Sequence, residues 1–162
     1  MAESILIDQA LSKAEKYELL LVQIRALIGT DTNQVSVLAN CSATLHQGLG
    51  HFWTGFYLTQ ETGLSLGPFQ GPVACMRIEN GRGVCGTSLA EKRTIIVPDV
   101  ALFPGHIACS AESKSEIVVP VFNREKDVVA VLDIDSKFEA SFDEVDQRYL
   151  EQFCSWLSEQ IF

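Results

Sequence analysis

Three segments between Gly67 and Ser136 organise this 162-residue chain: GPFQGPVACMRIENGRGVCGTSL (residues 67–89), FPGHIACSAESKSEIVVPV (103–121) and VLDIDS (131–136). They contain three of the five cysteines, Cys75, Cys85 and Cys109. Carboxylates follow on two strand-like runs, at Glu116, Asp133 and Asp135. Thiols that can pair, placed near acids that can hold a proton, indicate redox chemistry on a small molecule.

The run from 128 to 135 is the most informative of the predicted strands. Its apolar residues alternate with the others and form one face, made of Val128, Ala130, Leu132 and Ile134. Asp133 and Asp135 then point to the opposite face, roughly 7 Å apart. Glu116, on the preceding predicted strand at 116–122, lies opposite or diagonal to one of them, depending on the register. A solvated face would interleave lysine or arginine, so this patch of acids predicts a function.

The remaining elements follow from periodicity and turn signals. Apolar spacing predicts helices over about 8–27 and, after a capping box formed by Asp31 and Gln34, up to residue 49. A last helix starts from a capping box at Ser141 and Glu144. Strands are expected at 52–58, 64–70, 72–78 and 94–97, and a short helix at 84–92.

This order predicts an α+β fold in one domain spanning residues 1–162. About six strands form a mostly antiparallel sheet, with two N-terminal helices and one C-terminal helix packed on a face. The loop from 99 to 115 carries Phe103 and Ile107, which favour a pocket wall or lid over disorder. The terminal helices are apolar enough to predict a homodimer that pairs through them.

Charge and cysteine usage exclude several classes of protein. A net charge of −9 without a basic stripe argues against nucleic acid or anionic membrane as partner. No signal peptide and no apolar run of about 20 residues is present, so we expect a cytoplasmic protein. In that reducing compartment an odd number of cysteines excludes a fully paired disulfide framework. Cys41 and Cys154 lie on helical apolar stripes and are expected to fill the core.

The aromatic run at 52–58 has two interpretations. Trp53, Gly55 and Tyr57 share one face of the predicted strand, and the missing side chain at Gly55 leaves a gap between two rings. A flat apolar ligand group fits such a gap. Packing of the rings in the core of a sheet explains the same pattern.

Residues 81–86, GRGVCG, match the glycine fingerprint of dinucleotide-binding folds. That motif requires a buried parallel strand and a βαβ unit around it, whereas the preceding runs indicate antiparallel hairpins. We therefore interpret the glycines as a tight turn into the short helix that carries Cys85.

The quoted motifs, together with GFYL at 55–58 and the order of elements, resemble a GAF domain, and more specifically the free methionine-(R)-sulfoxide reductases. The resemblance covers about residues 40–136. It implies Cys109 as the catalytic cysteine, Cys75 as the resolving one and Cys85 as an auxiliary thiol. It further implies substrate binding by Trp53, Tyr57, Glu116, Asp133 and Asp135.

The implied reaction reduces free methionine sulfoxide through a sulfenic acid on Cys109. Condensation with Cys75 or Cys85 then forms a disulfide, which thioredoxin or a similar dithiol reductant resets. Neither a metal nor an organic cofactor is expected. Two alternatives stay open: a GAF domain that binds a small ligand without catalysis, and a structural zinc site made by Cys75, Cys85, Cys109 and His106.

Overall fold

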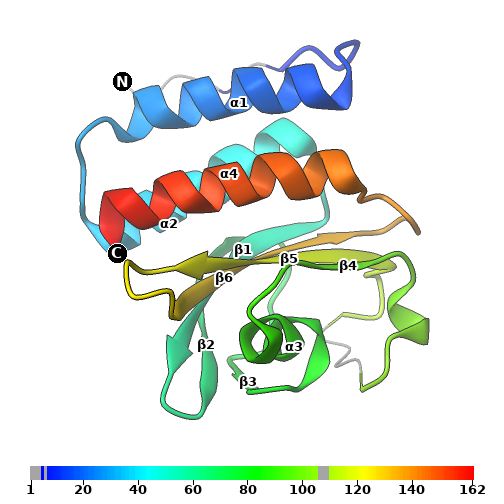
Figure 1. Ribbon diagram of the computed structural model, residues 1–162. Helices are drawn as coiled ribbons and strands as arrows, with labels where there is room; N and C mark the ends of the chain where they lie inside the picture. Colours follow the sequence, from blue (N-terminus) through cyan, green and yellow to red (C-terminus); the bar gives the residue numbers. More distant parts are fainter. Residues whose placement is uncertain (1–4, 6, 106–109) are drawn as a thin grey trace.

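The computed structural model describes residue 5 and residues 7–105 and 110–162, and places helices on one face of an antiparallel sheet (Figure 1). Helices α2 (Gln34–Leu49) and α4 (Glu144–Ile161) lie on this face, and α1 (Lys13–Ile28) lies over them on the side away from the sheet. The strands are β1 (Trp53–Gln60), β2 (Gly63–Gln70), β3 (Arg77–Glu79), β4 (Ile95–Val97), β5 (Ser115–Phe122) and β6 (Val128–Ser136). The other face carries α3 (Gly83–Glu91) and a 3-10 turn at Val100–Leu102.

The sheet has the order β3-β2-β1-β6-β5-β4, and every neighbouring pair is antiparallel. This confirms the expected α+β class with six strands and helices at both ends of the chain. Strand β6 lies in the middle of the sheet, between β1 and β5. Its side chains alternate between the faces, so it contributes to two separate apolar clusters.

The cluster on the helix side contains Ala130, Leu132 and Ile134 of β6, packed under α2 and α4. The cluster on the other side includes Val131 and Val128. Val128 was expected on the face of Leu132, and that expectation was wrong. The pairing of β5 with β6 shifts between Val121 and Phe122, and such an irregularity turns the following side chain to the opposite face.

The structure moves the N-terminal caps of two helices relative to the sequence prediction. Helix α2 is capped by Asn33, whose side chain accepts a hydrogen bond from the Ser36 N–H at 3.0 Å, and not by Asp31. Helix α4 is capped by Asp143, which forms a capping box with Asp146, and not by Ser141. In each case a competing cap residue stood two positions later in the sequence.

The strand expected at 72–78 is reduced to Arg77–Glu79, and Cys75 lies in the loop before it. Cys75 therefore does not share a strand face with Val73 and Arg77. Gly71 has a φ of 128°, and Pro72 has no N–H to donate to a ladder, so the chain leaves the sheet after β2.

Within the described residues, no helix is both long and apolar enough to cross a membrane. The apolar stripes of the terminal helices are used inside the chain: Tyr17, Leu20 and Ile24 of α1 lie in one core cluster with Phe153 and Leu157 of α4. A homodimer through these helices stays a prediction.

A buried carboxylate joins α1 to α4. Asp146 is 1% exposed, and its Oδ1 accepts a hydrogen bond from the Tyr17 hydroxyl at 2.8 Å. Its Oδ2 accepts from Lys13 Nζ at 2.5 Å and from the Asp143 N–H at 2.8 Å. Burial, with the Asp146 charge second, raises the pKa of the Tyr17 hydroxyl, which stays protonated and donating.

We expect Tyr17→Phe to lower the free energy of unfolding by about 2 kcal/mol, because a buried charged acceptor loses one of its donors. Chemical denaturation monitored by circular dichroism measures this change. Tyr149→Phe is the matched control: the two rings stack at 5.3 Å, but the Tyr149 hydroxyl donates to Glu18 at the edge of the core. Equal losses in the two variants would contradict a special role for the Asp146 contact.

Candidate active site

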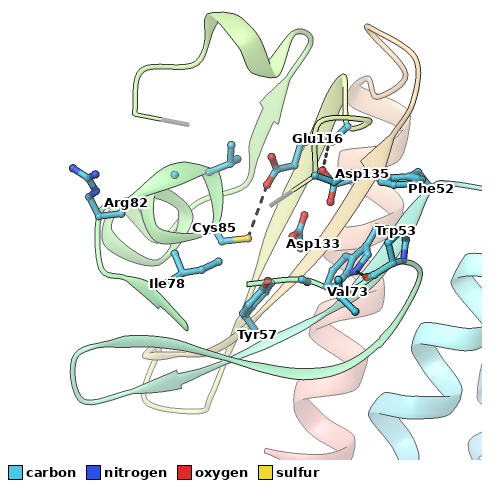
Figure 2. Close-up of a pocket in the computed structure, with 16 residues that line it drawn as sticks. Phe52, Trp53, Tyr57, Val73, Ile78, Arg82, Cys85, Glu116, Asp133 and Asp135 are labelled. Atoms are coloured by element: carbon cyan, nitrogen blue, oxygen red, sulfur yellow. Dashed lines mark hydrogen bonds between the residues drawn. The ribbon is translucent and has the colours of Figure 1, made fainter. Parts of the chain in front are cut away.

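A pocket opens on the sheet face opposite α2 and α4, between the sheet, α3 and the loop that carries Cys75 (Figure 2). Its empty volume is about 590 Å³, counting the part open to solvent. The lining combines apolar and aromatic side chains with a small acidic floor: Phe52, Trp53, Tyr57, Ile78, Val84 and Cys85 beside Glu116, Asp133 and Asp135.

Strand register brings the three carboxylates together. Glu116 of β5 pairs directly with Asp135 of β6, so of the two positions that the sequence allowed, opposite or diagonal, Glu116 lies opposite Asp135. Asp133 lies two residues away along the same face of β6. On its other side β6 pairs with β1, where Trp53 lies opposite Asp135 and Gly55 lies opposite Asp133. Glu116 and Asp133 are each 6% exposed. The structure thus places two predicted acids in a buried patch and the third at its more open end.

Helix α3 presents Cys85 to this patch. The side chain is buried, and its Sγ lies 3.9 Å from Glu116 Oε1, the contact dashed in Figure 2. Burial raises the pKa of the Cys85 thiol well above its ordinary value, and the charges of Asp133 and Glu116 raise it further. Cys85 is therefore a protonated thiol at neutral pH.

The carboxylates also retain protons. Burial, with repulsion from the other acids second, raises the pKa of Glu116 and of Asp133 well above the ordinary range. Burial raises the pKa of Asp135 to about 6, although the hydrogen bond from the Ser113 hydroxyl acts in the opposite direction. Three like charges in one buried patch cannot all be present together, so the patch holds at least one proton near neutral pH.

The structure decides between the two interpretations of the aromatic run at 52–58. Trp53 stacks on Phe69 at 5.2 Å and lies 6.0 Å from Tyr57. A Cβ at Gly55 would lie 2.3 Å from Phe69 Cβ and 2.7 Å from the Trp53 ring. The gap at Gly55 is thus filled by Phe69 and Trp53, and no ligand group fits there.

Both predicted aromatic residues hold the loop at 71–76. The indole Nε1 of Trp53 donates to the Pro72 carbonyl at 3.1 Å, and the Tyr57 hydroxyl donates to the Cys75 carbonyl at 3.0 Å. These contacts hold a loop whose residues Pro72, Val73 and Ala74 line the pocket, with Cys75 directly after them. Sequence reasoning found Trp53 and Tyr57 but missed this role, and it missed Ser113, because a loop serine carries no pattern that marks its partner.

The cysteines fall into distinct states. Cys41, Cys85 and Cys154 are free and buried, and Cys41 and Cys154 belong to the helix-side core, as expected. Cys75 is disulfide-bonded. It is therefore not a zinc ligand in this structure, which contradicts the structural zinc site that included it. Cys109 and His106 lie outside the described residues, so the catalytic role of Cys109 stays a prediction.

The glycine motif at 81–86 has a packing explanation. Gly81 and Gly83 have φ values of 76° and 61°, and a Cβ at Gly86 would lie 2.4 Å from the Glu79 carbonyl oxygen. The glycines let α3 start directly against β3, an antiparallel strand. The dinucleotide interpretation is excluded, and the same turn places Cys85 in the pocket.

We expect Asp135→Asn to stabilise the ligand-free protein by about 3 kcal/mol near neutral pH. The folded protein holds the Asp135 proton more tightly than the unfolded chain, so stability falls as the pH rises from about 4 to about 6 and then levels. Asparagine keeps the acceptor for Ser113 and removes this fall.

Denaturation curves across this pH range measure the effect. The exposed Glu159→Gln on α4 is the control and should leave the pH profile unchanged. An unaltered profile in Asp135→Asn would contradict a raised pKa at this site.

Comparisons with known proteins show which family this chain belongs to. The GAF domain family matches residues 17–161. GAF domain-containing protein A of Dictyostelium discoideum is 51% identical, over 97% of this chain and 99% of its own. The free methionine-R-sulfoxide reductase of Saccharomyces cerevisiae is 41% identical, over 97% and 92%.

A solved structure extends the likeness to three dimensions. The free methionine-R-sulfoxide reductase of Neisseria meningitidis, in complex with its substrate, superposes with a TM-score of 0.92 at 45% identity, covering 96% of this chain and 93% of that one. By sequence, fold and site, the chain belongs to the GAF domain family and, within it, to the free methionine-R-sulfoxide reductases.

Proposed function

We propose that this protein reduces free L-methionine (R)-S-oxide to L-methionine. The observation that carries the proposal is the buried, proton-retaining patch of Glu116, Asp133 and Asp135 at the floor of an aromatic-walled pocket. A sulfoxide sulfur becomes a good electrophile only when its oxygen is protonated or strongly hydrogen-bonded. The names of the relatives support the same substrate.

The patch serves two parts of the substrate. A carboxyl group that has kept its proton donates to the sulfoxide oxygen, and a carboxylate that remains charged attracts the ammonium group of a free amino acid. Asp135 is the one suited to the second role, because its pKa is about 6 and it lies at the open end of the patch. The apolar wall contributed by Trp53 and Phe52 packs against the methyl and methylene groups.

The catalytic cycle starts with the Cys109 thiolate, a role that comes from the resemblance. Its sulfur attacks the sulfoxide sulfur, the oxygen takes the proton of the acid patch, and methionine leaves while Cys109 becomes a sulfenic acid. A second thiol then displaces water and forms a disulfide. Two thiols of thioredoxin or a similar reductant reduce that disulfide and are themselves oxidised.

The states of the other cysteines favour Cys75 as the second thiol. Cys75 is disulfide-bonded and lies in a loop, whereas Cys85 is a free, buried thiol. The raised pKa of Cys85 leaves little thiolate to attack a sulfenic acid. Cys85 acts instead as a weak donor to Glu116 that helps to hold the acid patch.

The function is tested by incubating the protein with dithiothreitol and, separately, free R sulfoxide, free S sulfoxide and a peptide-bound form. We expect methionine to form only from the free R isomer. Cys109→Ser should lose turnover, while Cys154→Ser, on the helix-side core, should retain it. Turnover of the peptide-bound form alone would overturn the assignment, and binding without turnover in the unmodified protein would favour a ligand sensor.

We expect Glu116→Gln to lower kcat/KM by about 100-fold or more, because the amide cannot transfer a proton to the sulfoxide oxygen. Steady-state kinetics on the free R isomer measure this. The exposed Glu159→Gln is the matched control. If Glu116→Gln retained the activity of the control, the proposed proton transfer from Glu116 to the sulfoxide oxygen would be contradicted.

A further inference from the structure

Three side chains at the pocket floor are arranged as the ligands of a metal ion. One atom from each of Cys85, Glu116 and Asp133 lies within 4.8 Å of the others, and all three residues are buried. Figure 2 shows Cys85 reaching from α3 toward the two carboxylates on β5 and β6. We propose that these residues bind a thiophilic divalent cation, Zn²⁺ foremost, and that the bound ion blocks the pocket as a reversible inhibitor.

A second observation, the hydrogen bonding of Asp133, also points to a ligand. The Oδ1 atom of Asp133 is buried and has no hydrogen-bond partner among the described residues, in a side chain that is 6% exposed. A buried carboxylate oxygen without a partner is destabilising. A cation at this position supplies the missing partner.

One edge of the cluster is close to that of a tetrahedral zinc site. Zn–S distances of about 2.3 Å and Zn–O distances of about 2.1 Å place sulfur and oxygen ligands about 3.6 Å apart. The distance between Cys85 Sγ and Glu116 Oε1 is 3.9 Å. The Cys85–Glu116 distance is thus within a few tenths of an ångström of the zinc value, and the ligand oxygen of Asp133 lies within 4.8 Å of both of these atoms.

The donor set selects the metal. One sulfur and two carboxylate oxygens suit Zn²⁺, whereas Mg²⁺ and Ca²⁺ require oxygen ligands alone. No salt bridge recorded within residues 7–105 and 110–162 neutralises this patch. The entering cation displaces to solvent the thiol proton of Cys85 and any proton held by Glu116 and Asp133, and it forms a metal–thiolate and two metal–carboxylate bonds with no change in oxidation state.

Metal binding and the proposed reaction exclude each other. Glu116 and Asp133 cannot hold a cation and donate to a sulfoxide oxygen at the same time, and all three ligand residues line the substrate pocket. Because Cys85 is free while Cys75 is disulfide-bonded, the metal site is complete with that disulfide present. The blocking part of the inference rests on the proposed function; the binding part does not.

Binding is tested on the full chain, stripped with a chelator and titrated with Zn²⁺ against a chromophoric competitor. We expect one equivalent to bind with an affinity that falls at least about tenfold in Cys85→Ser and in Asp133→Asn. Cys154→Ser is the matched control, since it removes a free buried thiol from the other core cluster. Circular dichroism verifies that each variant is folded. If Cys85→Ser does not fold, Asp133→Asn alone tests the metal site.

Co²⁺ in place of Zn²⁺ adds a spectroscopic readout. A thiolate-to-metal charge-transfer band should appear in the unmodified protein and in Cys154→Ser, and be lost in Cys85→Ser. Absence of tight binding, or equal affinity in all variants, would overturn the site.

Kinetics test the blocking. Zn²⁺ should raise KM for the free R sulfoxide without lowering kcat, and a chelator should reverse this. Tight binding without an effect on KM would overturn the inhibitory role. Metal-free activity is measured alongside, so a failure of the proposed reductase function is seen separately from a failure of metal binding.

Discussion

The antiparallel pairing of β5 with β6 is the constraint on which the site depends. It sets Glu116 directly opposite Asp135 and leaves Asp133 on the same face, while Leu132 and Ile134 of β6 point into the helix-side core. Because side chains alternate with a period of two, a slip of one residue would bury the acids under the helices and expose the aliphatic residues. Burial of the apolar face therefore fixes the position of the acidic one.

The acidic floor is maintained at the expense of stability. Three carboxyl groups and a thiol share a buried patch, and burial is the main cause that raises the pKa of each. Such groups would be replaced by apolar ones if stability alone were selected, since buried ionisable groups destabilise a fold. The compensation comes from the other side of the sheet, where the helix-side core buries a large apolar surface that includes Phe56, Leu132 and Phe153.

The thiols are separated by environment. Cys41 and Cys154 are inert core residues whose pKa is raised by burial, and Cys85 is kept protonated beside the acids. Cys75 is carried by a loop that the Trp53 and Tyr57 side chains hold through backbone carbonyls. Two residues that a sequence pattern marks as pocket aromatics thus also position the loop that carries the disulfide-bonded Cys75.

The sequence by itself determined the class of fold, the element order and the acid patch, because hydrophobic periodicity and strand alternation are local properties. It also marked Cys75, Cys85 and Cys109 and the family that shares their motifs. Only the tertiary structure decided the register of Glu116 against Asp135, the filling of the Gly55 gap by Phe69, and the contact of Cys85 with Glu116. These depend on segments far apart in the chain, whose relative placement is set by packing of the whole sheet and not by the residues nearby.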